Sequence, residues 1–154
     1  MIKLSANGAE LTLDVSGYQF PDAPPGDWDD NWLQIKGTVK SERGEWSFHD
    51  PCMTATELST MASWLMHVAT LHESSQMSFL EPCLELRRDE ADPLGAIVVV
   101  LSHEASPPWV TGDARYGDAF QLRLATSVSD LAIAAKQALA LATRYPDRSI
   151  PDAS

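Results

Sequence analysis

Residues 54–73 have the sequence TATELSTMASWLMHVATLHE, in which apolar residues recur every three or four positions. This spacing predicts an α-helix with one buried face. Thr54 followed by Glu57 has the spacing of a capping box, so we expect the helix to begin there and to end near Glu73. The predicted buried stripe consists of Leu58, Met61, Ala62, Leu65, Val68 and Ala69. A helix with such a stripe needs a sheet to cover it.

A second helix is predicted near the C-terminus, from Ser127 to Tyr145. Ser127 followed by Asp130 repeats the capping signal, and Pro146 closes the helix. Its apolar face is expected to consist of Val128, Leu131, Ala135, Ala138 and Ala142. Both predicted helices therefore have one apolar side, which favours packing on a common core.

Segments that alternate between apolar and polar residues precede each helix, and we expect them to be strands. Asn7-Gly8 supplies the positive φ angles of a tight hairpin turn. Pro51 and Cys52 are expected to end the first run, and the IVVV of residues 97–100 is expected to be a central strand buried on both faces. The expected strands are 2–6, 10–18, 32–39, 45–49, 83–88, 96–102 and 120–124, with further strand material at Phe79-Leu80.

Runs of strands that each end in a helix predict an α+β fold, with a mainly antiparallel sheet and two packed helices. The chain has 154 residues, of which 44% are hydrophobic and 21% charged, as in ordinary globular proteins. We expect a single domain over residues 1–147, followed by a flexible tail over residues 148–154.

The charge balance narrows the classes of partner. Eleven Lys and Arg against 22 Asp and Glu give a formal net charge of −11. This disfavours direct binding to nucleic acid, where cations supply most of the affinity, and to an anionic membrane. The remaining classes of partner are a neutral ligand, a metal or a basic protein. The charge could also serve only solubility.

Two cysteines, Cys52 and Cys83, are too few for the disulfide framework of a secreted protein, and the sequence leaves open whether they approach each other. The first residues form no signal peptide, and no apolar run approaches the roughly 20 residues of a membrane span. We therefore expect a soluble, cytoplasmic protein, and its oligomeric state stays open.

An acidic, proline-rich segment, DAPPGDWDDNWLQI, occupies residues 22–35. It belongs to the span from Leu4 to Ile35, which contains no Lys, Arg or His. Loop tryptophans beside carboxylates are typical of protein-binding surfaces. The other interpretation is that the acids only keep the protein soluble and the tryptophans pack on its own surface. The candidate partner-binding residues are Asp22, Asp27, Trp28, Asp29, Asp30 and Trp109.

Catalysis is the alternative function. His49-Asp50 and His103-Glu104 each follow a predicted strand, so an enzyme would have a histidine and carboxylate cleft near His49, His103 and Glu104. Neighbours along a strand point to opposite faces, however, so neither pair forms a catalytic unit alone. The sequence contains no GxSxG, GxxxxGK[ST], GxGxxG, HExxH or CxxC motif. We therefore expect no catalytic residue, no metal and no cofactor.

The chain resembles the WapI-type bacterial immunity proteins and their relatives over nearly its whole length, and Asp30-Asn31-Trp32-Leu33 is the most specific part. The resemblance implies a small protein encoded beside a polymorphic toxin, which it binds and neutralises without catalysis or cofactor. For the named member of the family the toxin is a nuclease acting on tRNA. The segments that carry the resemblance are DDNWLQIKGTV (29–39), GEWSFHDPC (44–52), ELSTMASWL (57–65), FLEPCLELR (79–87), LSHEASPPW (101–109) and RYPDR (144–148).

Overall fold

The computed structural model describes residues 1–71, 75–89 and 96–149. Four strands followed by a helix occur twice along the chain, and this confirms the predicted α+β class. The elements are β1 (Ile2–Ala6), β2 (Ala9–Tyr18), β3 (Trp32–Ser41), β4 (Gly44–Thr54), α1 (Ala55–Leu71), β5 (Gln76–Ser78), β6 (Leu84–Arg88), β7 (Ile97–Leu101), the short 3-10 helices η1 (His103–Ala105) and η2 (Gly112–Tyr116), β8 (Phe120–Leu124) and α2 (Val128–Arg144).

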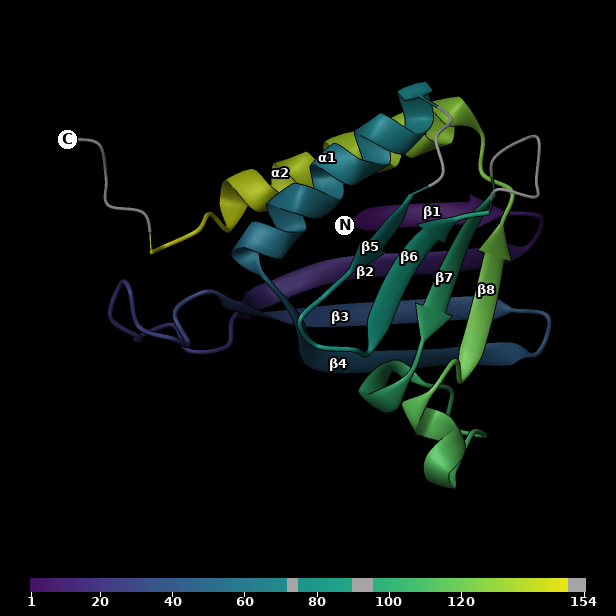
Figure 1. Ribbon diagram of the computed structural model, residues 1–154, viewed down its shortest axis with the longest axis horizontal. Coiled ribbons are helices and arrows are strands. Elements are labelled where there is room, and N and C mark those ends of the chain that lie inside the picture. The colour runs from purple at the N-terminus through teal and green to yellow at the C-terminus, as the bar shows by residue number, and fades with distance from the viewer. Residues whose placement is uncertain (72–74, 90–95, 150–154) are drawn as a thin grey trace.

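The strands form two sheets where the sequence led us to expect one. The orders are β1-β2-β3-β4 and β5-β6-β7-β8, and each neighbouring pair is antiparallel. Figure 1 shows the strands of the first sheet crossing those of the second, with the two helices side by side over them. Helix α1 separates β4 from β5 in the chain, so the second run of strands begins a sheet of its own.

In the first sheet, the predicted alternation along β3 is confirmed. Leu33, Ile35, Gly37 and Val39 are buried, and the residues between them are exposed or half-buried. The hairpin at Asn7-Gly8 is also as predicted, with φ angles of 52° and 83° at the two residues.

The expected end of the first run at Pro51 and Cys52 is wrong, because β4 continues to Thr54. Its pairing with β3 skips between Leu33 and Ile35, which face Met53 and Asp50. Such a bulge on an edge strand accommodates a proline without loss of a ladder hydrogen bond. The strand expected at Phe79-Leu80 is also wrong, since β5 ends at Ser78.

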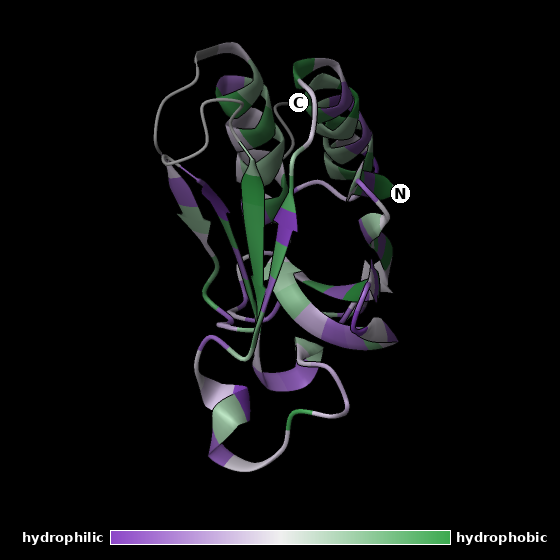
Figure 2. Ribbon diagram, turned by 90° about the vertical axis from the view of Figure 1, so that its right-hand side faces the viewer, coloured by the Kyte–Doolittle hydropathy of each residue, from purple (hydrophilic) through white to green (hydrophobic). Residues whose placement is uncertain are grey.

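The second sheet has the IVVV segment at its centre, as predicted. Strand β7 lies between β6 and β8, and four of its five residues are buried, with Val98 half-buried. Figure 2 shows β7 as hydrophobic along its length. Unbroken β-branched residues suit a strand covered on both faces.

Both predicted helix starts are confirmed by their caps. The Thr54 N–H donates to Glu57 Oε1 (3.0 Å), the Glu57 N–H donates to Thr54 Oγ1 (3.2 Å), and the Asp130 N–H donates to Ser127 Oγ (3.1 Å). The expected end of the first helix at Glu73 lies outside the described residues. Val128, expected on the apolar face of α2, is 47% exposed, since it lies in the first turn at the end of the helix.

Both helices and both sheets share one hydrophobic core. Helix α2 also protects the edge of the first sheet, where the Lys3 N–H of β1 donates to Gln137 Oε1 (3.0 Å). Among the described helices, none has the length and apolar character needed to cross a membrane.

Candidate functional site

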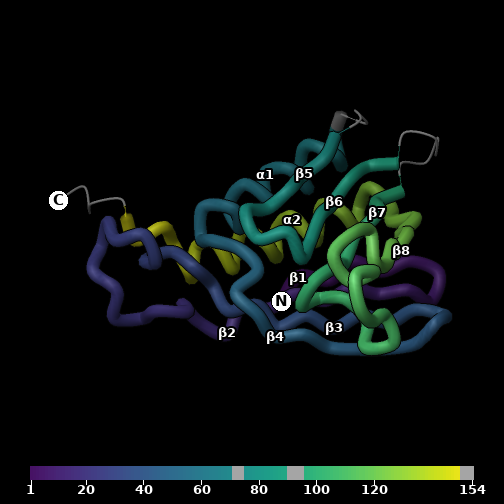
Figure 3. The backbone as a smooth tube through the Cα atoms, turned by 60° about the horizontal axis from the view of Figure 1, so that its bottom comes forward, coloured from purple at the N-terminus to yellow at the C-terminus, as the bar shows by residue number. Residues whose placement is uncertain are grey.

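The loop between β2 and β3, residues 19–31 (the acidic loop), extends from one end of the molecule (Figure 3). The side chains of Asp22, Asp27 and Asp29 are exposed on it. Together with Phe20 and Pro21 they line a hollow of about 350 Å³. A hollow with three carboxylates and an apolar wall can accept a lysine or arginine side chain.

Trp28, between Asp27 and Asp29 in the chain, has 89% of its surface exposed, the highest value among the large hydrophobic residues described. Its own backbone N–H donates to Asp27 Oδ1 (2.8 Å), which fixes the two neighbours relative to each other. Exposed aromatic rings are the side chains that contribute most binding energy at protein interfaces. Trp28 therefore presents a large apolar surface to solvent.

Asp30 differs from the other three aspartates because it is only 4% exposed. Its carboxylate accepts a hydrogen bond from the Gly26 N–H (2.7 Å), and Gly26 has a φ of 87°, which a side chain would strain. The Asp30 carboxylate therefore shapes the acidic loop from inside.

Trp109, the sixth candidate, lies at the other end of the first sheet. Its ring is 5.2 Å from that of Trp46 and 6.2 Å from that of Phe120, edge to face, and it covers Gly44 at the β3–β4 turn. The ten residues of β3 separate this turn from the acidic loop, and at about 3.3 Å per residue that is roughly 30 Å. Trp28 and Trp109 therefore do not form one surface.

The histidines of the enzyme alternative make separate hydrogen bonds but act on one group of carboxylates, because His49 lowers the pKa of Asp50, His103 lowers that of Glu81, and Glu104 raises both. The His49 ring Nε2 lies 3.0 Å from Ser16 Oγ, whereas the His103 ring Nδ1 lies 3.0 Å from Ser102 Oγ. The His103 ring also packs on Tyr116, edge to face at 5.2 Å. Within the described residues, no hydrogen bond, ion pair or ring contact joins one histidine to the other or to Glu104.

Three carboxylates do influence one another near these histidines. Burial raises the pKa of Asp50, and the Glu104 carboxylate raises it further. Burial likewise raises the pKa of Glu81, and Glu104 and Asp50 add to the effect. Asp50 faces Ile35 within β3, and Glu104 precedes Ala105, whose carbonyl accepts a hydrogen bond from Trp46 Nε1 (2.9 Å), so this group lies along the sheet rather than on the acidic loop. Sequence reasoning missed Glu81, whose only signal was its place just before a strand.

Cys52 and Cys83, whose proximity the sequence left open, are both buried and hydrogen-bonded to each other. This hydrogen bond, burial and the nearby carboxylates raise the pKa of the Cys52 thiol. A thiol that keeps its proton is a poor nucleophile. In the described part of the chain, no three His, Cys, Asp or Glu side chains are placed to hold a metal ion.

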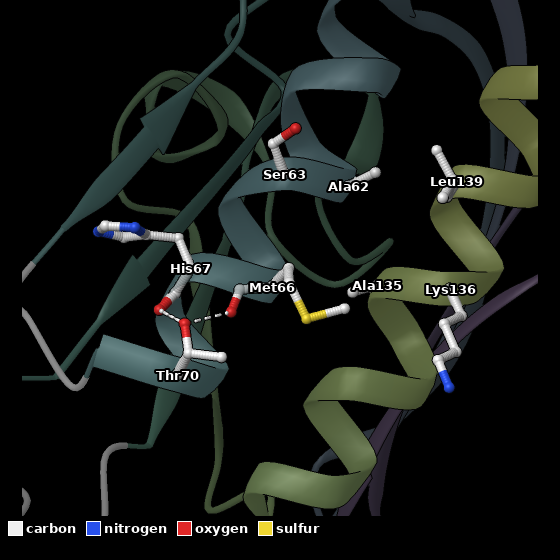
Figure 4. A pocket seen from close by; sticks show the side chains of 8 residues that line it. All are labelled: Ala62, Ser63, Met66, His67, Thr70, Ala135, Lys136 and Leu139. Atoms are coloured by element: carbon white, nitrogen blue, oxygen red, sulfur yellow. Dashed lines mark hydrogen bonds between the residues drawn. The ribbon is translucent and has the colours of Figure 1, made fainter.

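A second hollow, of about 360 Å³, lies between α1 and α2 (Figure 4). Met66 reaches across it from α1, and Leu139 and Lys136 border it on α2. Its lining includes one lysine and no carboxylate, so it does not suit a basic partner. The full lining is Ala62, Ser63, Met66, His67, Thr70, Ala135, Lys136 and Leu139.

The chain is thus an α+β domain with an exposed acidic loop between β2 and β3. The model of the immunity protein WapI-like family matches residues 1–146, and the chain belongs to that family. No curated protein and no solved structure matched the chain.

Proposed function

We propose that this protein binds and neutralises one cognate toxin, that the toxin is basic, and that the acidic loop is part of the contact surface. The observation that carries the proposal is the hollow lined by Asp22, Asp27 and Asp29, together with the exposed ring of Trp28. A lysine or arginine of the toxin would occupy the hollow, and the indole ring would cover apolar surface next to it.

Charge gives this surface a kinetic advantage. The protein has a formal net charge of −11, and the exposed carboxylates of Asp22, Asp27 and Asp29 carry part of it on the acidic loop. A field of one sign steers an oppositely charged partner and raises the association rate by a factor of 10 to 10³, by order of magnitude. Association should therefore be fast at low ionic strength.

The toxin that best fits an acidic inhibitor is a nuclease. A protein that holds RNA does so with Lys and Arg against phosphate. Carboxylates presented by an inhibitor would occupy the same cations and exclude the RNA. Neutralisation would then follow from occupancy alone, in the cytoplasm of the producing cell and without direct contact between this protein and nucleic acid.

A role without catalysis is supported by the geometry around the histidines and cysteines. One ring nitrogen of His49 and one of His103 lies 3.0 Å from a serine hydroxyl, and the pKa of Cys52 is raised. No step of the proposed function requires a nucleophile, a metal or a cofactor from this chain.

The test is growth of a host that expresses the toxin of the neighbouring gene together with this protein. We expect protection by the wild type and by His103→Asn, a substitution that tolerates the positive φ of 51° at this position. The variant with Asp22, Asp27 and Asp29 changed to asparagine and Trp28 to alanine should protect poorly. Leu139→Ser, which alters the groove between the helices, is the matched surface control.

Loss of protection on Leu139→Ser, with full protection by the acidic-loop variant, would move the contact surface to the helices. If the wild type turned over a toxin component, and His103→Asn lost both this turnover and protection, the enzyme would be favoured. Absence of protection by the wild type would reject the proposed function itself.

A further inference from the structure

Arg148 lies against the acidic loop although 118 residues separate it from Asp30. Its guanidinium donates to three backbone carbonyls of the loop: Pro21 O from Nη1 (2.9 Å), Phe20 O from Nη2 (3.0 Å) and Asp30 O from Nε (2.7 Å). A second hydrogen bond runs from Nη2 to Asp30 O. One side chain therefore joins the first residues of the loop to the last.

The same guanidinium stacks on Tyr18, the last residue of β2, with its Cζ 3.8 Å from the ring centroid. The Tyr18 hydroxyl donates to Pro146 O (2.6 Å), just before the segment that carries Arg148. These contacts fix the position of the guanidinium where the chain enters the loop.

Asp147 and Asn31 fix the exit of the loop. Asn31 Nδ2 donates to the Asp147 carboxylate, and the Arg148 N–H donates to Asn31 Oδ1 (2.8 Å). Thr56 Oγ1 of α1 donates to the other Asp147 oxygen (2.7 Å). Burial alone would raise the pKa of Asp147, but hydrogen bonds from Ser149, Thr56 and Asn31 lower it to about 2, so the carboxylate is charged at neutral pH.

We propose that Asp147 and Arg148 form a clasp that sets the conformation of the acidic loop and, through it, the affinity for the toxin. This inference rests on the proposed function, because it takes the acidic loop as the contact surface. A loop held in its binding conformation loses less freedom on association and binds more tightly. Asp147 and Arg148 directly follow residue 146, where the match to the family model ends.

The test compares Arg148→Ala with Arg148→Lys, and uses Arg144→Ala as the matched control. Arg144 ends α2, and its guanidinium packs on Tyr145 rather than on the loop. Amide hydrogen exchange is followed at Gly26 and Asp30, whose N–H groups donate to Asp30 Oδ2 and Asp27 O. Binding of the toxin encoded by the neighbouring gene is measured on the same samples.

In Arg148→Ala we expect exchange at both amides to accelerate about tenfold or more, as the loss of a hydrogen bond from a charged group implies, and toxin affinity to fall by a similar factor. Arg148→Lys should recover part of each effect, because an ammonium keeps the charge but cannot form the planar fork. Arg144→Ala should match the wild type in both measurements.

Three results would overturn the clasp. Unchanged exchange in Arg148→Ala would show that the guanidinium does not hold the loop. Faster exchange with wild-type affinity, while the variant with Asp22, Asp27 and Asp29 changed to asparagine still binds weakly, would reject the clasp and leave the proposed function standing. Wild-type affinity in Arg148→Ala and in the triple asparagine variant alike would reject the acidic loop as the contact surface, and with it the clasp.

Discussion

The four aspartates of the acidic loop occupy two kinds of environment. Asp22, Asp27 and Asp29 are exposed around a hollow, whereas Asp30 is buried and accepts a hydrogen bond from Gly26. The exposed carboxylates can meet a cation at little structural cost, and the buried one cannot be replaced without altering the loop. Identical side chains therefore have different functions because the backbone turns at Gly26.

Charge and stability are linked at Asp50. Burial and the Glu104 carboxylate raise its pKa in the folded state, so the folded protein binds a proton more tightly than the unfolded chain. Stability is therefore lost as pH rises through the raised pKa, and the penalty is complete above it. Asp50→Asn should raise stability at pH 7 by roughly 0.2–1 kcal/mol, the scale of partly exposed charge interactions.

Urea unfolding at pH 7 and at pH 3.5 measures this effect. The gain in stability from Asp50→Asn should shrink at the lower pH, because the wild-type carboxyl is then protonated and, like the asparagine, uncharged. Equal stability of variant and wild type at pH 7 would refute the proposed repulsion.

At the scale of elements, α1 depends on the apolar stripe that its sequence predicts. Leu65 is fully buried in the shared core, whereas Leu139 on α2 is 58% exposed. Leu65→Ala should lower the free energy of unfolding by about 2 to 5 kcal/mol, and Leu139→Ala should change it by less than about 0.5 kcal/mol. Chemical denaturation of the two variants checks the contrast, and a cost below about 1 kcal/mol at Leu65 would be incompatible with its burial.

Gly37 of β3 leaves room for the ring of Phe48 on β4. A Cβ added at Gly37 would lie 2.1 Å from Cζ of Phe48, which faces it across the sheet. Gly37→Ala should therefore cost about 1 to 3 kcal/mol through overpacking. In a Phe48→Leu background the same substitution should cost less, and a double-mutant cycle in thermal unfolding measures the difference. If Gly37→Ala cost the same stability in both backgrounds, the Phe48 ring would not be the reason that glycine is needed at this position.

Local patterns predicted the elements more successfully than their assembly. The capping boxes at Thr54 and Ser127 and the alternation along β3 are properties of neighbouring residues, and the structure confirms them. The continuation of β4 through Pro51 depends on a bulge opposite Gln34, between Leu33 and Ile35, which no local pattern specifies. The division into two sheets likewise depends on which strands pair after α1 has formed.

The candidate site was predictable only in those features that depend on neighbouring residues. A cation-free acidic segment with Trp28 indicates an exposed charged loop, and its aspartates are exposed except for Asp30. The contacts of Arg148 with Phe20, Pro21 and Asp30 join residues more than a hundred positions apart, so no local pattern indicates them. Residues 148 and 149, the start of the expected tail, are hydrogen-bonded, and residues 150–154 lie outside the described part.

At the scale of the whole molecule, the exposed aspartates of the acidic loop lie at one end of the first sheet, and aromatic rings at the other. Asp22, Asp27 and Asp29 belong to the loop that precedes β3, whereas the rings of Trp46, Trp109 and Phe120 pack together near the β3–β4 turn. Glu104 lies nearer the rings, because it precedes Ala105, whose carbonyl accepts a hydrogen bond from Trp46 Nε1.

The most direct measurement is the association rate with the toxin of the neighbouring gene at increasing ionic strength. Between about 0.1 M and 1 M salt the Debye length falls from about 10 Å to about 3 Å, so steered association should slow steeply while dissociation changes little. Changing Asp22, Asp27 and Asp29 to asparagine should slow association at low salt about tenfold or more and flatten its salt dependence. A triple variant that associates at the wild-type rate at low salt would contradict the account.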